Sequence, residues 1–512
     1  MADHNRVWII DFGSQYTQLI ARRVRELAVL SEIVLPAVTA EEIRRQNISA
    51  LILSGGPASV YAQDAPQIDP AILDLDIPVL GICYGLQLLI RYRGGRVHSD
   101  NHREYGRSRI TIRQPHPLFA GIDNPTTVWM SHGDHVDSIP DGFETIAFSE
   151  DGAPAAIVDT GRPQMGLQFH PEVVHTTEGQ RILAAFLFGV AHLKADWTAQ
   201  HFIAESIAKI RARVGHQQVI LGLSGGVDSS VMAVLMNQAI GRQCIPVFID
   251  NGLLRLNEHQ QVIRQLRQLG VRVRSYNFST TFLDSLAGVT DPERKRKIIG
   301  RVFIRVFEKI ARRYPGAAFL AQGTLYPDVI ESRSVRGPSQ VIKSHHNVGG
   351  LPKRMKLELV EPFNNLFKDE VRLIGHELGL ADDIIYRHPF PGPGLAVRII
   401  GAVTRHRLRL LREADAIFIE ELKRSGEYRR VWQAFVVLIP VKTVGVMGDQ
   451  RTYEQVVALR SVNSSDGMTA DWSRLPDELL SRVANRIVNQ IRGINRVVYD
   501  ISSKPPGTIE WE

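Results

Sequence analysis

The sequence predicts an α/β protein with two doubly wound parallel-sheet domains followed by a small α+β domain. Before residue 389, short apolar segments that end in glycine turns alternate with amphipathic segments of helical periodicity. Strands that alternate with helices form parallel sheets covered on both faces. After that point, a proline-rich loop is followed by long helices and a few short strands. The length fits about three domains, and we place them at residues 1–192, 197–388 and 389–512.

The composition is that of a globular protein with no membrane span. Hydrophobic residues make up 44% of the chain and charged residues 22%, which is ordinary for a folded domain. No uncharged apolar run reaches the ~18 residues of a transmembrane helix, and the first residues lack the layout of a signal peptide. We therefore expect a cytoplasmic protein. Its net charge of +7 fits ligands that carry phosphate, or RNA, and does not choose between them.

The first domain is expected to alternate strands and helices around Cys83. The predicted strands cover residues 7–13, 50–57 and 78–85, and the predicted helices cover residues 15–27, 86–91 and 181–193. Cys83 stands in Gly-x-Cys-x-Gly between a strand and a helix, the pattern of a nucleophile elbow. A helix N-terminus favours the thiolate form of such a cysteine. For Cys83 taken alone, the alternative is a buried structural thiol. Cys83 and Cys244 are the only cysteines of the sequence, too few for a zinc site or a disulfide framework.

A proton partner for Cys83 is found in Gln168-Phe169-His170-Pro171-Glu172. Residues two apart in an extended segment face the same way, so Glu172 can orient His170. The combination of an elbow cysteine with this segment indicates nucleophilic catalysis by a thiolate.

The middle domain is organised around a second glycine turn, at residues 224–230. Its predicted strands cover residues 218–223, 246–250, 271–273 and 318–323, and its predicted helices begin at about residues 198, 231 and 258. Glycines and helix-start N–H groups in Ser224-Gly225-Gly226-Val227-Asp228-Ser229-Ser230 form an anion cradle. Asp228 would repel phosphates unless it holds Mg²⁺. The chain contains no Gly-Lys-Ser/Thr, so this is not the common P-loop.

Other polar segments of the middle domain carry weaker signals. Residues 343–352 are interpreted as a mobile lid, whose adjacent histidines point apart and lack a third metal ligand. The basic run at residues 291–297 would ordinarily coat a solvated helix face. Lys368 by itself would be an ordinary lysine on a helix surface.

The last domain is expected to contain helices at residues 407–424 and 476–492. Strands are predicted at residues 433–439, 443–447 and 497–501. Pro505-Pro506 stiffens the segment after Lys504. Final residues usually fray, but the apolar Ile509 and Trp511 favour a packed tail.

Three groups of motifs resemble known families. GICYG, SGGP and QFHPE resemble the class I glutamine amidotransferases. This resemblance implies that Cys83 attacks the glutamine carboxamide, that His170 moves protons and that Glu172 holds His170. Gly56 and Tyr84 would supply backbone N–H groups to the oxyanion. Residues 130–134 also match a segment near the glutamine site, although His132 could equally lie on a surface turn.

SGGVDSS resembles the pyrophosphate-binding loop of the ATP pyrophosphatases, which cleave ATP between its α and β phosphates. The resemblance implies that Lys368 and the loop residues bind ATP. It also implies Mg²⁺ as a cofactor that enters with ATP, and no organic prosthetic group.

HPFPGPG, VGVMGD and SKPPGTIEWE complete a resemblance of the whole chain to the GMP synthetase family. The implied reaction adenylates XMP with ATP, displaces AMP with ammonia from glutamine, and gives GMP and pyrophosphate. The implied XMP contacts are Arg296, Gln433, Lys504 and Glu510. The third domain would form a homodimer, and neither nucleic acid nor membrane is an expected partner.

Three other functions remain as alternatives at this stage. A tRNA-thiolating enzyme also uses an SGGxDS loop, but it needs cysteines that carry sulfur, and Cys83 and Cys244 are already assigned to an elbow and a strand. A glutamine or nucleotide sensor would not need the complete set of Cys83, His170 and Glu172. A glutamine-using ligase that acts on a carboxylate is opposed only by the C-terminal motifs.

Overall fold

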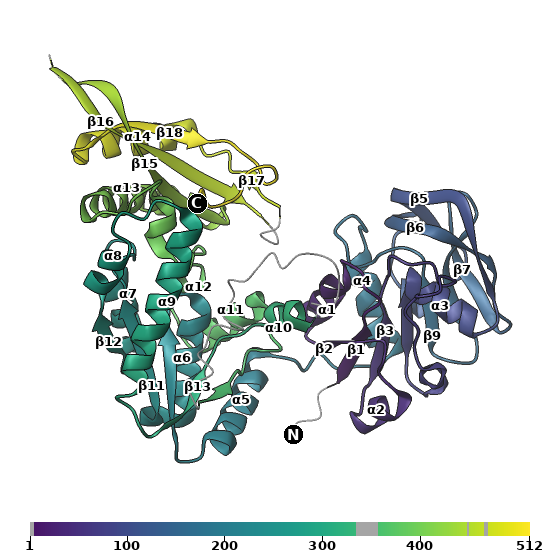
Figure 1. Ribbon diagram of the computed structural model, residues 1–512. Helices are drawn as coiled ribbons and strands as arrows, with labels where there is room; N and C mark the ends of the chain where they lie inside the picture. The colour runs from purple at the N-terminus through teal and green to yellow at the C-terminus, as the bar shows by residue number, and fades with distance from the viewer. Residues whose placement is uncertain (1–4, 334–356, 448–449, 465–468) are drawn as a thin grey trace. The chain divides into compact units, whose positions relative to one another are not determined.

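The computed structural model describes residues 5–333, 357–447, 450–464 and 469–512 (Figure 1). The segment 343–352, which we interpreted as a lid, lies outside these residues, as do Gly448 and Asp449 of the VGVMGD motif. The chain forms two compact units, Met1–Glu205 and Ser206–Glu512. The three-domain boundaries inferred from the sequence stay predictions.

The first unit is built on a mixed sheet whose described strands run in the order β2-β1-β3-β4-β9-β8-β7-β5-β6. The first five are mutually parallel, and β8 joins β9 in antiparallel fashion. The parallel part consists of β1 (Arg6–Ile10), β2 (Leu30–Val34), β3 (Ala50–Leu53), β4 (Val79–Ile82) and β9 (Gln164–Leu167). The antiparallel part consists of β5 (Arg96–Ile112), β6 (Thr126–Ser138), β7 (Phe143–Ser149) and β8 (Pro154–Asp159).

The helices of the first unit connect these strands and cover the sheet. They are α1 (Thr17–Glu26), α2 (Ala40–Arg45), α3 (Tyr84–Tyr92) and α4 (Gly179–Ala184), with short 3₁₀ turns at Pro70–Asp74 and Pro117–Phe119. The helix expected at residues 181–193 is divided, because α4 continues as a π-helical segment, η3 (Ala185–Val190). Strands β3 and β4 are buried along their whole length, as expected for strands covered on both faces.

The second unit begins with a parallel sheet of order β12-β11-β10-β13-β14. Its strands are β10 (Gln218–Leu223), β11 (Cys244–Asp250), β12 (Arg274–Asn277), β13 (Ala317–Ala321) and β14 (Glu358–Val360). Its helices are α5 (Ala199–Val214), which crosses the boundary between the units, α6 (Val227–Ile240), α7 (Glu258–Gln268), α8 (Ser279–Ser285), α9 (Pro292–Ala311), α10 (Tyr326–Arg333), α11 (Lys368–Glu377) and α12 (Asp382–Ile385).

The prediction of a strand at residues 271–273 is wrong. The Val271 N–H instead donates to the Leu266 carbonyl and closes the end of α7. Pairing with β11 begins only at Arg274, opposite Val247.

The C-terminal part adds a second sheet in which β15 (Gln433–Met447), β16 (Gln450–Asn463) and β17 (Asp471–Trp472) are neighbours, and β18 (Ile494–Asp500) pairs with β16. The two strands expected at residues 433–439 and 443–447 are one strand with a register shift between Ile439 and Lys442. Helices α13 (Arg405–Arg424) and α14 (Asp477–Gln490) pack on each other, and they contact β15 and β18, respectively. Short 3₁₀ turns lie at η5 (Gly394–Arg398) and η6 (Glu427–Arg429).

One apolar cluster joins the two sheets of the second unit. It includes residues of β10, β11 and α9 together with residues of α13, α14 and β15. The fold class is confirmed as α/β with parallel-rich sheets and a C-terminal sheet that contains antiparallel strands. Among the described residues, no helix is long and apolar enough to cross a membrane.

Candidate active sites

Cys83 lies at the turn between β4 and α3 with φ +51° and ψ −104°. A positive φ is rare for a residue with a side chain and marks a strained position. The turn is held tightly: the Cys83 N–H donates to the Leu167 carbonyl at 2.7 Å, and a Cβ on Gly85 would lie 2.3 Å from the Leu53 carbonyl oxygen. The glycine is therefore required for α3 to approach β3, and the predicted elbow geometry is present.

His170 follows β9 and forms a buried pair with Glu172. The His170 Nδ1 lies 2.7 Å from Glu172 Oε1, and the two residues are 3% and 0% exposed. Burial opposes protonation of the ring, but the Glu172 carboxylate and the Cys83 side chain raise the pKa of His170 well above its ordinary value. A histidine in this setting favours the imidazolium that forms when a thiol gives up its proton.

The glycine turn after β3 reaches the same place. A Cβ on Gly55 would lie 3.0 Å from Cε1 of His170, and one on Gly56 would lie 3.1 Å from the Tyr84 ring. Tyr84 is the first residue of α3, where a backbone N–H has no acceptor within the helix. The structure thus brings together Cys83, His170, Glu172, Gly56 and Tyr84, the residues that the sequence analysis predicted for thiolate attack on a carboxamide.

Residues 130–134 also lie beside Cys83. The Cys83 Sγ is 3.6 Å from the Ser131 carbonyl oxygen. His132 is buried in β6, 3.3 Å from Glu104 Oε2, and burial lowers its pKa to about 4. The surface-turn alternative for His132 is therefore wrong.

Two polar residues near this centre were missed by the sequence analysis. The buried Gln87 donates to the Asp134 carbonyl at 3.0 Å. Gln87 lies four residues after Cys83, the residue that caps α3, so both lie on the same side of the first helical turn. This spacing could have revealed Gln87. Gln168 is buried, and neither atom of its side-chain amide has a hydrogen-bond partner among the described residues; only its place two residues before His170 hints at this.

In the second unit, the predicted anion loop lies between β10 and α6. Gly225 has φ +81°, and Gly226 caps the first turn of α6. The Ser224 and Ser229 hydroxyls are 3.0 Å apart. Arg387, which the sequence analysis missed, donates to the Gly225 carbonyl at 2.8 Å and pairs with buried Glu258 at 2.8 Å. This contact spans 162 positions and has no local sequence signal.

Asp228 and Lys368 are brought together beside this loop. Lys368 Nζ lies 3.6 Å from Asp228 Oδ2, and the Lys368 side chain is 47% exposed. Its assignment to ATP stays a prediction. The other carboxylate oxygen of Asp228, Oδ1, is buried without a hydrogen-bond partner among the described residues. Within the same ranges, no group of three or more His, Cys, Asp or Glu side chains is arranged to hold a metal. A single carboxylate fits a Mg²⁺ whose other ligands are water and nucleotide phosphates.

Gln433 and Glu510, two of the predicted XMP contacts, meet in the C-terminal part. Gln433 Nε2 donates to Glu510 Oε1 at 2.9 Å. The same carboxylate receives two hydrogen bonds from the buried Arg398, at 2.8 and 3.0 Å. Ile509 is buried, and the Trp511 indole donates to Asp500. The tail is therefore packed rather than frayed.

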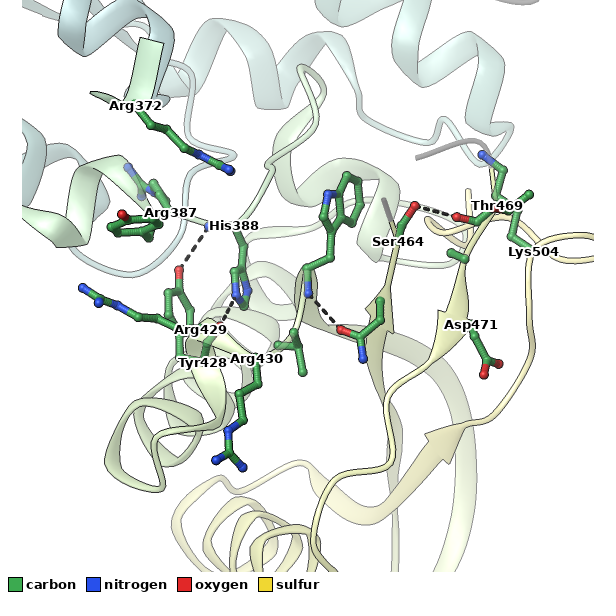
Figure 2. A pocket seen from close by; sticks show the side chains of 15 residues that line it. Arg372, Arg387, His388, Tyr428, Arg429, Arg430, Ser464, Thr469, Asp471 and Lys504 are labelled. Carbon is green, nitrogen blue, oxygen red and sulfur yellow. Dashed lines mark hydrogen bonds between the residues drawn. The ribbon is translucent and has the colours of Figure 1, made fainter. Parts of the chain in front are cut away.

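Lys504 lies at a different place, in a cavity of about 830 Å³ (Figure 2). Four arginines, Arg372, Arg387, Arg429 and Arg430, line it together with Lys504, whereas Asp471 is the one carboxylate among its described lining residues. In Figure 2, Lys504 lies across the cavity from Arg387 and Arg429. Each of these arginines also pairs with a carboxylate that does not line the cavity, so the cavity offers guanidinium hydrogen-bond donors to a phosphorylated ligand rather than unpaired charge.

Arg296 is not among the residues that line this cavity. It lies on α9 with its side chain 29% exposed, and its Nη1 is 3.8 Å from Glu293. The preceding Lys295 is the fully buried cation of this helix. Thus the four predicted XMP contacts are not gathered into one cluster by direct hydrogen bonds within the described residues.

Comparison with known proteins covers both units. A curated protein from Chlorobium chlorochromatii, named GMP synthase [glutamine-hydrolyzing], is 58% identical over 99% of both chains. The chain belongs to the glutamine-hydrolysing GMP synthase family. Relatives with the same name from Aquifex aeolicus and Maridesulfovibrio salexigens are 56% and 55% identical, over 99% and 100% of both chains.

Three family models match separate parts of this GMP synthase family member. The model for class I glutamine amidotransferases matches residues 8–190, which include Cys83, His170 and Glu172. The NAD synthase model matches residues 199–297, which include the anion loop and Arg296. The model for the GMP synthase C-terminal domain matches residues 420–511, which include Gln433, Lys504 and Glu510. Lys368 lies outside all three matches.

Proposed function

We propose that this protein is a ligase that aminates XMP to GMP, with glutamine as nitrogen donor and ATP cleaved to AMP and pyrophosphate. The observation that carries the proposal is that one chain holds both an elbow thiol with its His170–Glu172 pair and a glycine cradle with Asp228 and Lys368. Full-length similarity to proteins named GMP synthase supports the same reaction.

In the first unit, the Cys83 thiolate attacks the glutamine carboxamide carbon. The Gly56 and Tyr84 N–H groups donate hydrogen bonds to the developing oxyanion, and His170 delivers a proton to the departing ammonia. Water then cleaves the thioester and gives glutamate and the free thiol. Glu172 keeps the imidazole in its orientation through the 2.7 Å contact at Nδ1.

In the second unit, the loop from Ser224 to Ser230 and Lys368 bind the phosphates of ATP. Asp228 is the residue that would hold Mg²⁺, which neutralises charge on the departing pyrophosphate. The C2 oxygen of XMP attacks the α-phosphate, pyrophosphate leaves, and ammonia then displaces AMP from C2. We assign XMP to Arg296, Gln433, Lys504 and Glu510, with Lys504 and the neighbouring arginines on the phosphate side.

The decisive experiment compares nitrogen sources. The protein is incubated with ATP, Mg²⁺ and XMP, with either glutamine or an ammonium salt, and GMP, AMP and pyrophosphate are measured. Cys83→Ala should reduce glutamine-dependent GMP formation at least ~1000-fold while synthesis from ammonium stays within about twofold, because the thiolate serves only to release ammonia.

Asp228→Ala is the converse variant. It should abolish pyrophosphate formation with both nitrogen sources and leave some glutamine hydrolysis, because that reaction uses only the first unit. If the wild-type protein forms no GMP from XMP, or if Cys83→Ala loses both activities equally, the proposed function or the separation of the two sites is wrong.

A further inference from the structure

Lys295, one residue before Arg296 on α9, is completely buried and fully hydrogen-bonded. Its Nζ donates to the carbonyls of Ala396 and Ile399 at 3.1 and 2.7 Å, and it forms an ion pair with the Glu512 side chain, 217 positions away. These three acceptors match the three N–H groups of an ammonium. A charge can stay buried only when it is paired in this way.

The same contacts extend into the tail. The second oxygen of Glu512 accepts from the Gly401 N–H at 2.9 Å. Two residues earlier, Glu510 binds Arg398 and Gln433. Arg398 ends η5, the segment whose Ala396 carbonyl binds Lys295. Helix α9, the segment at residues 394–401 and the tail are therefore connected by continuous hydrogen bonds.

These hydrogen bonds join α9 to the tail, and each of the two carries a residue that we assign to the XMP site. Arg296 projects from α9 about 100° around the helix from Lys295, given 3.6 residues per turn. Glu510 lies on the tail, and Gln433 begins β15. Arg296 itself pairs weakly with Glu293, a residue of the same helix. That pair cannot hold α9 against the tail, so the contacts of Lys295 are the ones that do.

We propose that Lys295 and Glu512 are positioning residues that hold α9 and the tail in register, so that Arg296 and Glu510 engage the same nucleoside monophosphate. The inference rests on the proposed function, since it concerns how the XMP site is assembled. Lys295 and Glu512 themselves do not touch the nucleotide. Their effect is on XMP binding and not on ATP binding or on the glutamine reaction.

The test uses full-length protein with ammonium as nitrogen source, so that the first unit does not contribute. Lys295→Met should raise KM for XMP about tenfold or more, while KM for ATP and kcat at saturating XMP change less than about twofold. Glu512→Gln removes the charge and keeps only one of the two acceptor oxygens that bind Lys295 and Gly401. It should also raise KM for XMP, by a smaller factor than Lys295→Met. If Lys295→Met does not fold, Glu512→Gln still tests the proposal.

Two comparisons separate positioning from general destabilisation. Lys297→Met removes a cation of the same helix whose side chain is 68% exposed, and it should leave all three constants unchanged. Lys295→Met combined with Arg296→Ala should be no worse in KM for XMP than Arg296→Ala alone, because residues that act as one unit are not additive.

The inference is overturned if KM for XMP is unchanged in folded Lys295→Met or Glu512→Gln. Parallel changes in kcat and in KM for ATP, or additive effects with Arg296→Ala, would also overturn it. A wild-type protein that makes no GMP would instead reject the proposed function, so the two failures are distinguishable.

Discussion

At the scale of single residues, His388 shows how a buried ring is kept neutral. It is 5% exposed and stacks on Tyr428 with ring centroids 3.8 Å apart. Its Nε2 lies 2.8 Å from the Tyr428 carbonyl, and its Nδ1 accepts from the Ala434 N–H at 3.1 Å. This pattern requires the neutral tautomer with the proton on Nε2. Burial, which is the main cause, lowers the pKa of His388 to about 4.

This histidine should make the second unit less stable in mild acid. In the unfolded chain its pKa returns to about 6.5, so between pH 6.5 and pH 4 the unfolded state binds more protons than the folded state. The contribution of His388 to the free energy of unfolding is therefore complete above pH 6.5 and is lost as the pH falls from 6.5 toward 4. We expect a loss of about 2 kcal/mol in the free energy of unfolding between pH 7 and pH 5 from this group alone.

Urea unfolding of wild type and His388→Gln at pH 7 and pH 5 tests this expectation. Glutamine can accept from Ala434 and donate to Tyr428 but does not titrate, so the variant should lack that part of the pH dependence even though it loses the ring stacking. Equal losses in both proteins would show that His388 does not contribute.

The residues of the first site were predictable because their signals are local. Cys83 lies between two glycines, and His170 and Glu172 are two positions apart. By contrast, Lys295 and Arg398 become buried through partners that are 217 and 112 positions away. Nothing in the basic run at residues 291–297 separates the buried lysine from its more exposed neighbours.

At the scale of elements, α4 supports the histidine segment by close packing. A Cβ on Gly179, the first residue of α4, would lie 1.9 Å from the Pro171 carbonyl oxygen. Pro171 lies between His170 and Glu172. The helix can approach this segment only because residue 179 has no side chain.

Gly179→Ala should therefore impair glutamine hydrolysis without touching the second unit. The methyl group must displace α4 or Pro171, and a shift of about 1 Å at a catalytic pair can cost about 100-fold in rate. We expect at least a tenfold fall in glutaminase activity, with ammonium-supported synthesis retained. Both activities are measured by GMP formation with the two nitrogen sources.

Gly189→Ala is the matched control, because its new Cβ would have its nearest contact at 4.0 Å, with Pro117. It should keep both activities. Wild-type glutaminase in Gly179→Ala, or an equal loss of both activities, would contradict the packing argument.

The elements themselves were predicted well where strands are short and fully buried. The antiparallel strands were harder. In β16 only a short apolar stretch at residues 456–459 follows a polar start, and this pattern does not distinguish a strand from a helix. The register shift between Ile439 and Lys442 is likewise set by pairing with β16, which no local pattern of β15 records.

At the scale of the whole molecule, the end of the β15–β16 hairpin leaves apolar side chains exposed. Val444 and Tyr453 lie directly opposite each other and are 52% and 58% exposed. Val446, two residues along β15, is 73% exposed. Side chains two apart on a strand share a face, so these three form one apolar surface. Grouped exposed apolar residues often mark an interface.

We predict that this surface lies in a homodimer contact, the oligomer that the family resemblance implies. Val446→Lys should weaken association, because a lysine in an apolar interface is desolvated without a partner. Light scattering at micromolar concentration should give twice the 57.3 kDa chain mass for the wild type and a mass near 57.3 kDa for the variant. Leu35→Lys, a change at a residue of the first unit that is 68% exposed, should remain dimeric. A Val446→Lys protein that keeps the wild-type mass and the wild-type dissociation on dilution would exclude the hairpin from the interface.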